Sequence, residues 1–154
     1  MSLFFKSFPI HVNPCYSLAI VLVMAYVPHL TKKALLAKKL KEAGKQYTTA
    51  NSRGLSSLMV DDTPQGMRIA NIMGCHQNGL EAFAYYSVAV LASMVVGLES
   101  KVLSGFAGFF ILIRAMYTFV YMSKFNGAPR TLLFFASGFS CMGLMVLAGN
   151  KYSA

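Results

Sequence analysis

Four long apolar stretches constrain the fold of this chain more than any other feature. They run from about residue 10 to 30, 68 to 97, 102 to 123 and 129 to 148. Each is close to the roughly 20 residues that cross about 30 Å of hydrocarbon as a helix. The stretches show no alternation of apolar and polar residues, so helices are favoured over the strands of a barrel. We therefore predict a single membrane domain, residues 1–154, with four spanning helices.

The composition agrees with a membrane protein. Of the 154 residues, 56% are hydrophobic and only 12% are charged, whereas soluble domains average about 45–50% apolar and about 25% charged residues. A soluble enzyme of this length is therefore close to excluded. The three cysteines are an odd number, and Cys75 and Cys141 lie within apolar stretches, so no disulfide framework is expected.

The connections between the apolar stretches are unequal in length. Short links join the second stretch to the third and the third to the fourth, so these helices are expected to be antiparallel neighbours. The long connection, residues 31–67, is rich in lysine. By the positive-inside rule it is expected to be cytoplasmic, with both termini on the opposite side. The fold class predicted from these features is all-α, an integral membrane four-helix bundle with up-down topology.

Leucines recur at near-helical spacing among the lysines where the long connection begins, at Leu30, Leu35, Leu36 and Leu40. We expect a cytoplasmic extension of the first helix that lies against anionic headgroups. A nucleic-acid-binding patch is the alternative, but the aromatic residues typical of one are missing. Nearer the second apolar stretch, Thr63 followed by Pro64 predicts a helix start with Thr63 as its N-cap.

Polar side chains inside the apolar stretches are the candidates for function, because in lipid each must face protein or water. In two stretches they are spaced three and four residues apart, which places each set on one helical face. The sets are Asn71, Gly74, Asn78, Glu81 and Tyr85 in the second stretch, and Arg114, Tyr117, Tyr121 and Lys124 in the third. Arg130 opens the fourth stretch.

Glu81 and Arg114 both fall near the middle of the membrane, where an unpaired charge costs at least about 2.5–3.5 kcal/mol. We expect them to share one electrostatic network, directly or across a bound molecule. A purely structural ion pair is the alternative. Because the surrounding polar groups outnumber what one ion pair needs, we favour a polar cavity open toward the cytoplasm.

Residues 76–83, His-Gln-Asn-Gly-Leu-Glu-Ala-Phe, resemble the signature of the MAPEG family, the membrane-associated proteins in eicosanoid and glutathione metabolism. A second landmark agrees, and it consists of Arg114, Tyr117, Tyr121 and, in the next stretch, Arg130. Similar series occur in microsomal glutathione transferases. The resemblance covers the whole chain and is closest to a divergent branch of the family.

This resemblance implies a homotrimer in the endoplasmic reticulum or another internal membrane, in contact with membrane lipids. Glutathione would be the co-substrate, bound between neighbouring protomers at the cytoplasmic half. The other substrates would be lipophilic electrophiles or lipid hydroperoxides, so the activity would be that of a transferase or peroxidase. Asn78 and Glu81 match positions that hold glutathione, with Glu81 suited to its free amino group.

The resemblance also implies roles for the later residues. Tyr117 and Tyr121 match tyrosines near the peptide backbone and thiol of glutathione, and Arg114 would face a carboxylate or Glu81. Arg130 matches the arginine that activates the sulfur, so Arg130 and Tyr121 are the predicted catalytic residues. From its position alone, Arg130 is equally well explained as an arginine that reaches lipid phosphates at a helix boundary.

One position departs from the family's pattern. Many members carry an arginine four residues before the Asn, and here that residue is Gly74. Arg68 lies ten residues before Asn78, on a different helical face, so we do not expect it to replace the missing arginine directly. A non-catalytic membrane scaffold or accessory subunit is therefore the alternative function, and a small transporter or channel is a third.

Two further expectations concern metals and packing. Cys75 and His76 lack the additional ligands that zinc requires, so no metal site is expected. Small residues such as Gly105, Gly108, Gly138 and Gly143 would allow helices to approach closely, which suits an oligomer.

Overall fold

The computed structural model of the chain describes residues 1–44, 61–123 and 127–153, and within them it contains helices and short links but no strand. The prediction of an all-α fold is therefore confirmed. The helices are α1 (Ser2–Lys6), α2 (Pro14–Glu42), α4 (Pro64–Val95), α5 (Ser100–Met122) and α6 (Gly127–Tyr152).

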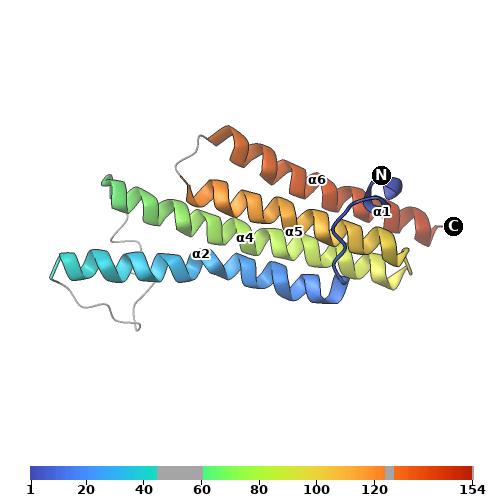
Figure 1. Cartoon of the computed structure of the whole chain (residues 1–154), viewed down its shortest axis with the longest axis horizontal. Helices are drawn as coiled ribbons and strands as arrows, with labels where there is room; N and C mark the ends of the chain where they lie inside the picture. Colours follow the sequence, from blue (N-terminus) through green and yellow to red (C-terminus); the bar gives the residue numbers. More distant parts are fainter. Residues whose placement is uncertain (45–60, 124–126, 154) are drawn as a thin grey trace.

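The four long helices lie side by side, and each runs opposite to the long helix before it in the chain (Figure 1). Helix α4 packs against α2, α5 and α6. Both chain termini lie at one end of the molecule (Figure 1), which we call the turn end because residues 96–99 lead from α4 into α5 there. We call the opposite end, where α2 ends and α4 begins, the loop end.

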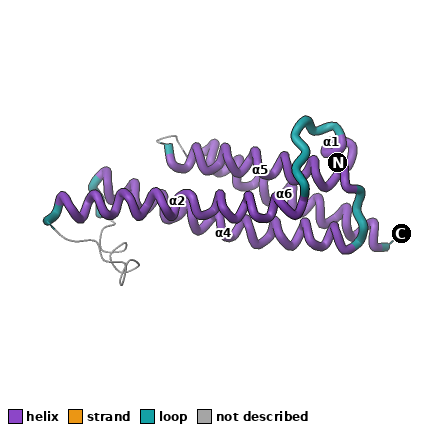
Figure 2. The backbone as a smooth tube through the Cα atoms, turned by 60° about the horizontal axis from the view of Figure 1, so that its bottom comes forward, coloured by secondary structure: helices purple, strands orange, loops and turns teal. Residues whose placement is uncertain are grey.

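At the loop end, α2 and α4 project beyond α5 and α6 (Figures 1 and 2). Helix α2 continues well past the predicted end of the first span, and α4 begins before the second, so helix occupies both ends of the expected connection. Residues 45–60 of that connection lie outside the described residues. The beginning of α4 is as predicted, because Thr63 is its N-cap and accepts a hydrogen bond from the Gly66 amide at 3.1 Å.

In the extension of α2, Leu36 and Leu40 pack against protein and not against lipid headgroups. Leu36 and Leu40 are fully buried, and the segment around them lies beside the first turns of α4, where Lys39 Nζ binds the Asp61 carboxylate at 2.8 Å. The prediction of a headgroup contact is wrong for these two leucines. Because α4 begins at Pro64, a protein surface is available to cover them.

Three of the described helices, α2, α5 and α6, are long and apolar enough to cross a membrane. Helix α4 is the longest but is not among them. Its first half carries several polar residues, namely Asn71, His76, Gln77, Asn78 and Glu81. These side chains lower the hydropathy of α4, so this helix depends on its neighbours for a polar environment.

The N-terminal segment crosses the turn end of α5. The Val12 amide donates to the Ser104 carbonyl at 3.1 Å. A Cβ atom at Gly105 would collide with the Phe5 carbonyl, and one at Gly108 would collide with the Ile10 carbonyl. The close approach expected at these glycines is therefore made within the chain, by the N-terminal segment.

Candidate functional site

Three polar residues from α4 and α5 form what we call the inner cluster, namely Asn78, Arg114 and Tyr117. The Asn78 side-chain amide donates to the Tyr117 hydroxyl at 2.8 Å, and Arg114 Nη2 donates to the Asn78 carbonyl at 3.2 Å. The Arg114 guanidinium also lies 4.2 Å from the centre of the Tyr117 ring. With Arg114 only 4% exposed and Tyr117 1% exposed, the cluster fastens α4 to α5.

The inner cluster leaves almost no free volume. Arg114 Nη1 is buried without a hydrogen-bond partner, and Arg114 lines a cavity of about 10 Å³ together with Cys75 and Thr118. A polar cavity needs at least about 10–15 Å³ to hold a single water. The inner cluster therefore has no room for a peptide-sized ligand within one protomer.

Glu81 and Arg114 do not pair with each other. Glu81 is exposed and accepts a hydrogen bond from Gln77 Nε2 at 3.3 Å. The ion pairs within the described part of the chain join other residues, Lys6 to Glu99 and Lys39 to Asp61. Three residues after Asn78, the helix has turned so that its next polar side chain lies about 60° away, and this rotation carries Glu81 outward. The expected direct link is absent between these two described residues.

A cavity of about 610 Å³ lies at the loop end, where α5 ends and α6 begins beside the first turns of α4. We call it the rim cavity. Its polar lining comes from Arg68 and Asn71 on α4, Tyr121 on α5 and Arg130 on α6. The Arg130 guanidinium lies 4.5 Å from the centre of the Tyr121 ring. Three helices thus bring two arginines, an amide and a phenol to one open volume.

Tyr121 connects the two regions. Its ring lies 5.4 Å from the ring of Tyr117, and its hydroxyl lies against Gly74, where a Cβ atom would be only 2.6 Å from the oxygen. The glycine that departs from the family's pattern therefore makes space for the Tyr121 hydroxyl beside the α4 backbone. Any side chain at this position would move the tyrosine.

The predicted site residues thus fall into three groups. Asn78, Arg114 and Tyr117 form the inner cluster, Tyr121 and Arg130 line the rim cavity, and Glu81 faces outward. Lys124, which shares the helical spacing of the tyrosines, lies outside the described residues.

Sequence reasoning set Arg68 aside and did not predict its place in the rim cavity. This residue lies on a different face from Asn78, as expected, yet it lines the same cavity as Tyr121 and Arg130. Its spacing of three residues from Asn71 was the available signal, because residues one helical turn apart lie on one side of a helix.

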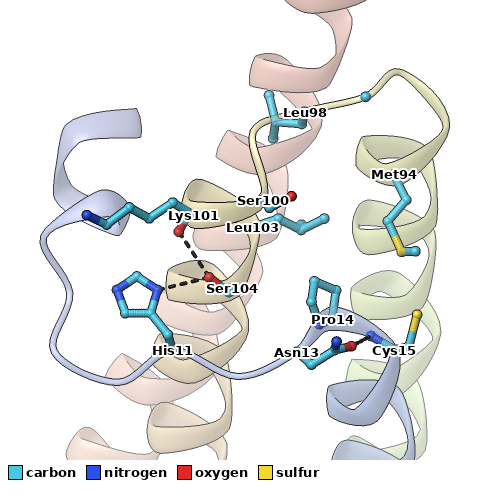
Figure 3. A pocket seen from close by; sticks show the side chains of 11 residues that line it. His11, Asn13, Pro14, Cys15, Met94, Leu98, Ser100, Lys101, Leu103 and Ser104 are labelled. Atoms are coloured by element: carbon cyan, nitrogen blue, oxygen red, sulfur yellow. Dashed lines mark hydrogen bonds between the residues drawn. The ribbon is translucent and has the colours of Figure 1, made fainter.

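A second cavity, of about 680 Å³, lies at the turn end (Figure 3). His11 Nδ1 and the Ser104 hydroxyl are 2.9 Å apart in its wall, and Lys101 is the formally charged residue among its described lining. It contains none of the predicted site residues. Although it is slightly larger, we regard the rim cavity as the candidate site, because convergent polar groups define a binding site better than volume does.

Searches of curated proteins and of solved structures return no match for this chain. The family model described as MAPEG family matches residues 13–150, which includes α2, α4 and α5 and nearly all of α6. The match covers both the inner cluster and the rim cavity. Together with three helices that are apolar enough to cross a bilayer, it identifies a membrane protein. This chain belongs to the MAPEG family, the proteins of glutathione and eicosanoid metabolism.

Proposed function

We propose that this chain is a membrane-bound, glutathione-dependent transferase or peroxidase that acts on lipophilic electrophiles or lipid hydroperoxides. Membership of the MAPEG family supports the proposal. The observation that carries it is the contact between Arg130 and Tyr121 in the rim cavity of about 610 Å³. Small-molecule sites have volumes of about 300–1,000 Å³, so glutathione fits as the co-substrate.

Arg130 provides the electrostatics that the reaction needs. A free thiol has a pKa of about 8.5 and is mostly protonated at neutral pH, whereas the thiolate is the nucleophile. A guanidinium within about 4–6 Å lowers the pKa of such a thiol by about 1–3 units. Arg130 is absent from the ion pairs of the described residues, so its charge is available to the sulfur. The Tyr121 hydroxyl is the second donor to that sulfur.

The activated thiolate serves either reaction. In conjugation, the sulfur forms a bond to an electrophilic carbon, and the leaving group departs with its electron pair. In peroxide reduction, two glutathione molecules are oxidised to the disulfide, and the lipid hydroperoxide is reduced to an alcohol and water. Lipophilic substrates reach the rim cavity from the surrounding bilayer.

The remaining predicted residues bind or position glutathione in this proposal. Asn78 and Glu81 bind the tripeptide, and the Glu81 carboxylate accepts a hydrogen bond from its amino group. Tyr117 lies along the peptide backbone. Arg114 already donates to the Asn78 carbonyl, and we assign it to positioning Asn78.

We further propose a homotrimer with four spanning helices in each protomer. Asn71, Gln77 and Glu81 are exposed on α4, and polar side chains facing lipid are costly. Neighbouring copies would cover these side chains and bring Glu81 toward bound glutathione. The lysine-rich loop end would face the cytoplasm, with the protein in the endoplasmic reticulum or another internal membrane.

The test compares purified wild type with Arg130→Ala and Arg130→Lys, with Lys101→Ala at the turn end as a control of equal charge change. Glutathione binding is measured by calorimetry. Rates are measured with a chromogenic aryl halide and with a lipid hydroperoxide. We expect Arg130→Ala to slow the reaction about 10- to 30-fold at pH 7. Loss of a pKa shift of about 1–3 units returns the bound thiol to a thiolate fraction of about 3%. Lys101→Ala should leave the rate unchanged.

The pH dependence gives a second readout. In Arg130→Ala, the rate should rise with pH until it approaches that of the wild type, since a more alkaline solution ionises the thiol without help. Absence of glutathione binding to the wild type, with rates indifferent to Arg130, would overturn the proposal. Such a result, with other membrane subunits co-purifying in fixed stoichiometry, would support the non-catalytic scaffold or accessory subunit instead.

A further inference from the structure

We infer that Arg68 is a ligand-binding residue of the rim cavity and that it holds the glycine carboxylate of glutathione. The inference rests on the proposed function, and it assigns a role to a residue outside the family resemblance. Arg68 is exposed at the mouth of the cavity, so its guanidinium is accessible to a ligand that enters from solution.

The charges around the rim cavity are unbalanced. Arg68 from α4 and Arg130 from α6 line the same volume, and its described lining contains no acidic side chain. The ion pairs within the described ranges 1–44, 61–123 and 127–153 involve neither arginine. Two guanidinium groups that converge on one volume repel each other, and an anionic ligand between them relieves that repulsion.

The surroundings of Arg130 and Arg68 suit them to different parts of glutathione. The guanidinium of Arg130 packs over the Tyr121 ring. This contact holds the positive charge in one place, as a group that stabilises the thiolate requires. Within the part of the chain that the structure describes, Arg68 makes no such ring contact. The planar fork of a guanidinium without such a contact matches a carboxylate through two parallel hydrogen bonds. A carboxylate is the group on glutathione that uses this geometry.

The distance along α4 between Arg68 and Asn78 indicates which of the two carboxylates of glutathione binds Arg68. Arg68 lies ten residues before Asn78, about 15 Å along the helix axis. An extended tripeptide spans about 10–11 Å, and a long arginine side chain covers the remaining distance. Because Asn78 and Glu81 bind the amino end of glutathione in the proposed function, the opposite end, the glycine carboxylate, reaches Arg68.

The surroundings of Arg68 favour the entry of an anion. Arg68 also lines a smaller cavity of about 110 Å³ between α2 and α4, together with Lys38 and Lys39. Lys39 is engaged with Asp61, whereas Lys38 is exposed. A cluster of basic side chains at the mouth of a cavity raises the local concentration of anionic ligands.

The test is calorimetry of glutathione with the full chain in detergent, using wild type, Arg68→Ala and Arg68→Lys. The matched control is Lys33→Ala, which removes the same charge from an exposed position on α2. We expect Arg68→Ala to raise the Kd about 10- to 100-fold, as for a lost charge-assisted hydrogen bond. The Kd of Arg68→Lys should lie between those of the wild type and Arg68→Ala, because lysine keeps the positive charge but lacks the planar fork of the guanidinium. Lys33→Ala should bind as the wild type does.

A second measurement uses glutathione monoethyl ester, in which the glycine carboxylate is masked. Wild type should bind the ester about 10- to 100-fold more weakly than glutathione, whereas Arg68→Ala should bind both with similar Kd. This comparison includes the wild-type protein, so it does not depend on the folding of a variant alone. Thermal melting of each variant checks that the fold is retained.

Two results would overturn the inference, and they differ from each other. If Arg68→Ala binds glutathione as tightly as the wild type, or prefers glutathione over the ester as strongly, Arg68 does not hold the carboxylate and the proposed function stands. If the wild type binds no glutathione at all, the proposed function fails, and this inference fails with it.

Discussion

The inner cluster and the rim cavity use the same kinds of residue, but they leave their polar groups in opposite conditions. In the inner cluster, Arg114 is buried, bonded to the Asn78 carbonyl and packed on Tyr117. In the rim cavity, Arg68 and Arg130 line an open volume that contains no acidic side chain in its described lining. One region has satisfied most of its polar groups within the protein, and the other keeps its charges available.

The ends of the neighbouring helices explain this difference. Beside Asn78, helix α5 supplies Tyr117 and Arg114, so the side chain and the carbonyl of Asn78 find partners there. Around Arg68, α5 is ending at Met122 and α6 is only beginning at Gly127. Among the described residues, the first turns of α4 therefore have no continuous helix beside them on that side. In the function proposed above, polar residues hold helices together where the helices are packed, and they bind the ligand where a neighbouring helix stops.

The largest expected effect is on stability, and it comes from substitutions of Tyr117 in the inner cluster. Tyr117→Ala removes a buried aromatic ring and should lower the free energy of unfolding by about 3–5 kcal/mol. Tyr117→Phe removes only the acceptor for Asn78 and should cost about 0.5–1.5 kcal/mol. Denaturant titration in mixed micelles measures both. If Tyr117→Ala kept full stability, the buried ring would not fasten α4 to α5 and the contrast would fail.

An intermediate effect is expected at the junction between the two regions. Gly74→Ala places a Cβ atom 2.6 Å from the Tyr121 hydroxyl and should displace the tyrosine. We expect the glutathione-dependent rate to fall by up to about 100-fold, as for a misplaced catalytic group. Stability should change by less than about 1 kcal/mol, since alanine favours helix more than glycine does.

The control for this substitution is Gly138→Ala on α6, where an added Cβ meets nothing within 4 Å. Gly138→Ala raises helix propensity by the same amount as Gly74→Ala, and it should leave the glutathione-dependent rate unchanged. Equal rates for Gly74→Ala and the wild type would mean that the position of the Tyr121 hydroxyl does not matter for catalysis.

The smallest effect concerns the ion pair that holds α2 against the start of α4. The Lys39 ammonium, with the Thr63 hydroxyl, holds the pKa of the Asp61 carboxyl below its usual value of 3.8. A carboxyl whose pKa is lower in the folded state stabilises the fold above its unfolded pKa and loses that contribution as the pH falls through the folded value. The contribution is therefore complete at neutral pH and disappears below about pH 4.

Melting temperatures between pH 7 and pH 3 test this interaction. Asp61→Asn should melt slightly below the wild type at pH 7, and the difference should vanish at acidic pH. Asp62→Asn, at the exposed neighbouring position, is the control and should follow the wild type at every pH. Because the pair is exposed, its effect should be small, and glutathione affinity should change little.

Much of this architecture follows from patterns that the chain displays directly. Uninterrupted apolar runs predict the long helices, and Thr63 before Pro64 predicts the beginning of α4, which is confirmed. The spacing of polar residues gives their angle around a helix but not the neighbour they meet. For that reason a network shared by Glu81 and Arg114 was expected, directly or across a bound molecule, and the direct link is absent between these two described residues. For the same reason, the place of Arg68 in the rim cavity was not predicted.

Two other features could not be predicted from helical periodicity. The burial of Leu36 and Leu40 depends on how far α4 extends at the loop end, which is a property of two helices together. The use of Gly105 and Gly108 by the N-terminal segment depends on where Phe5 of α1 and Ile10 of the following link lie, and helical periodicity in α5 does not give that position. Both are contacts between segments far apart in the chain.

The N-terminal segment has a practical consequence for handling this protein. Its backbone lies directly on α5 at Gly105 and Gly108, and the Met1 side chain lies against Gly143 on α6. We expect an affinity tag or fluorescent protein fused before Met1 to disturb these contacts and so to destabilise the packing of the N-terminal segment on α5 and α6. At the other terminus, Tyr152 is 82% exposed, so labels and surface attachments belong after α6.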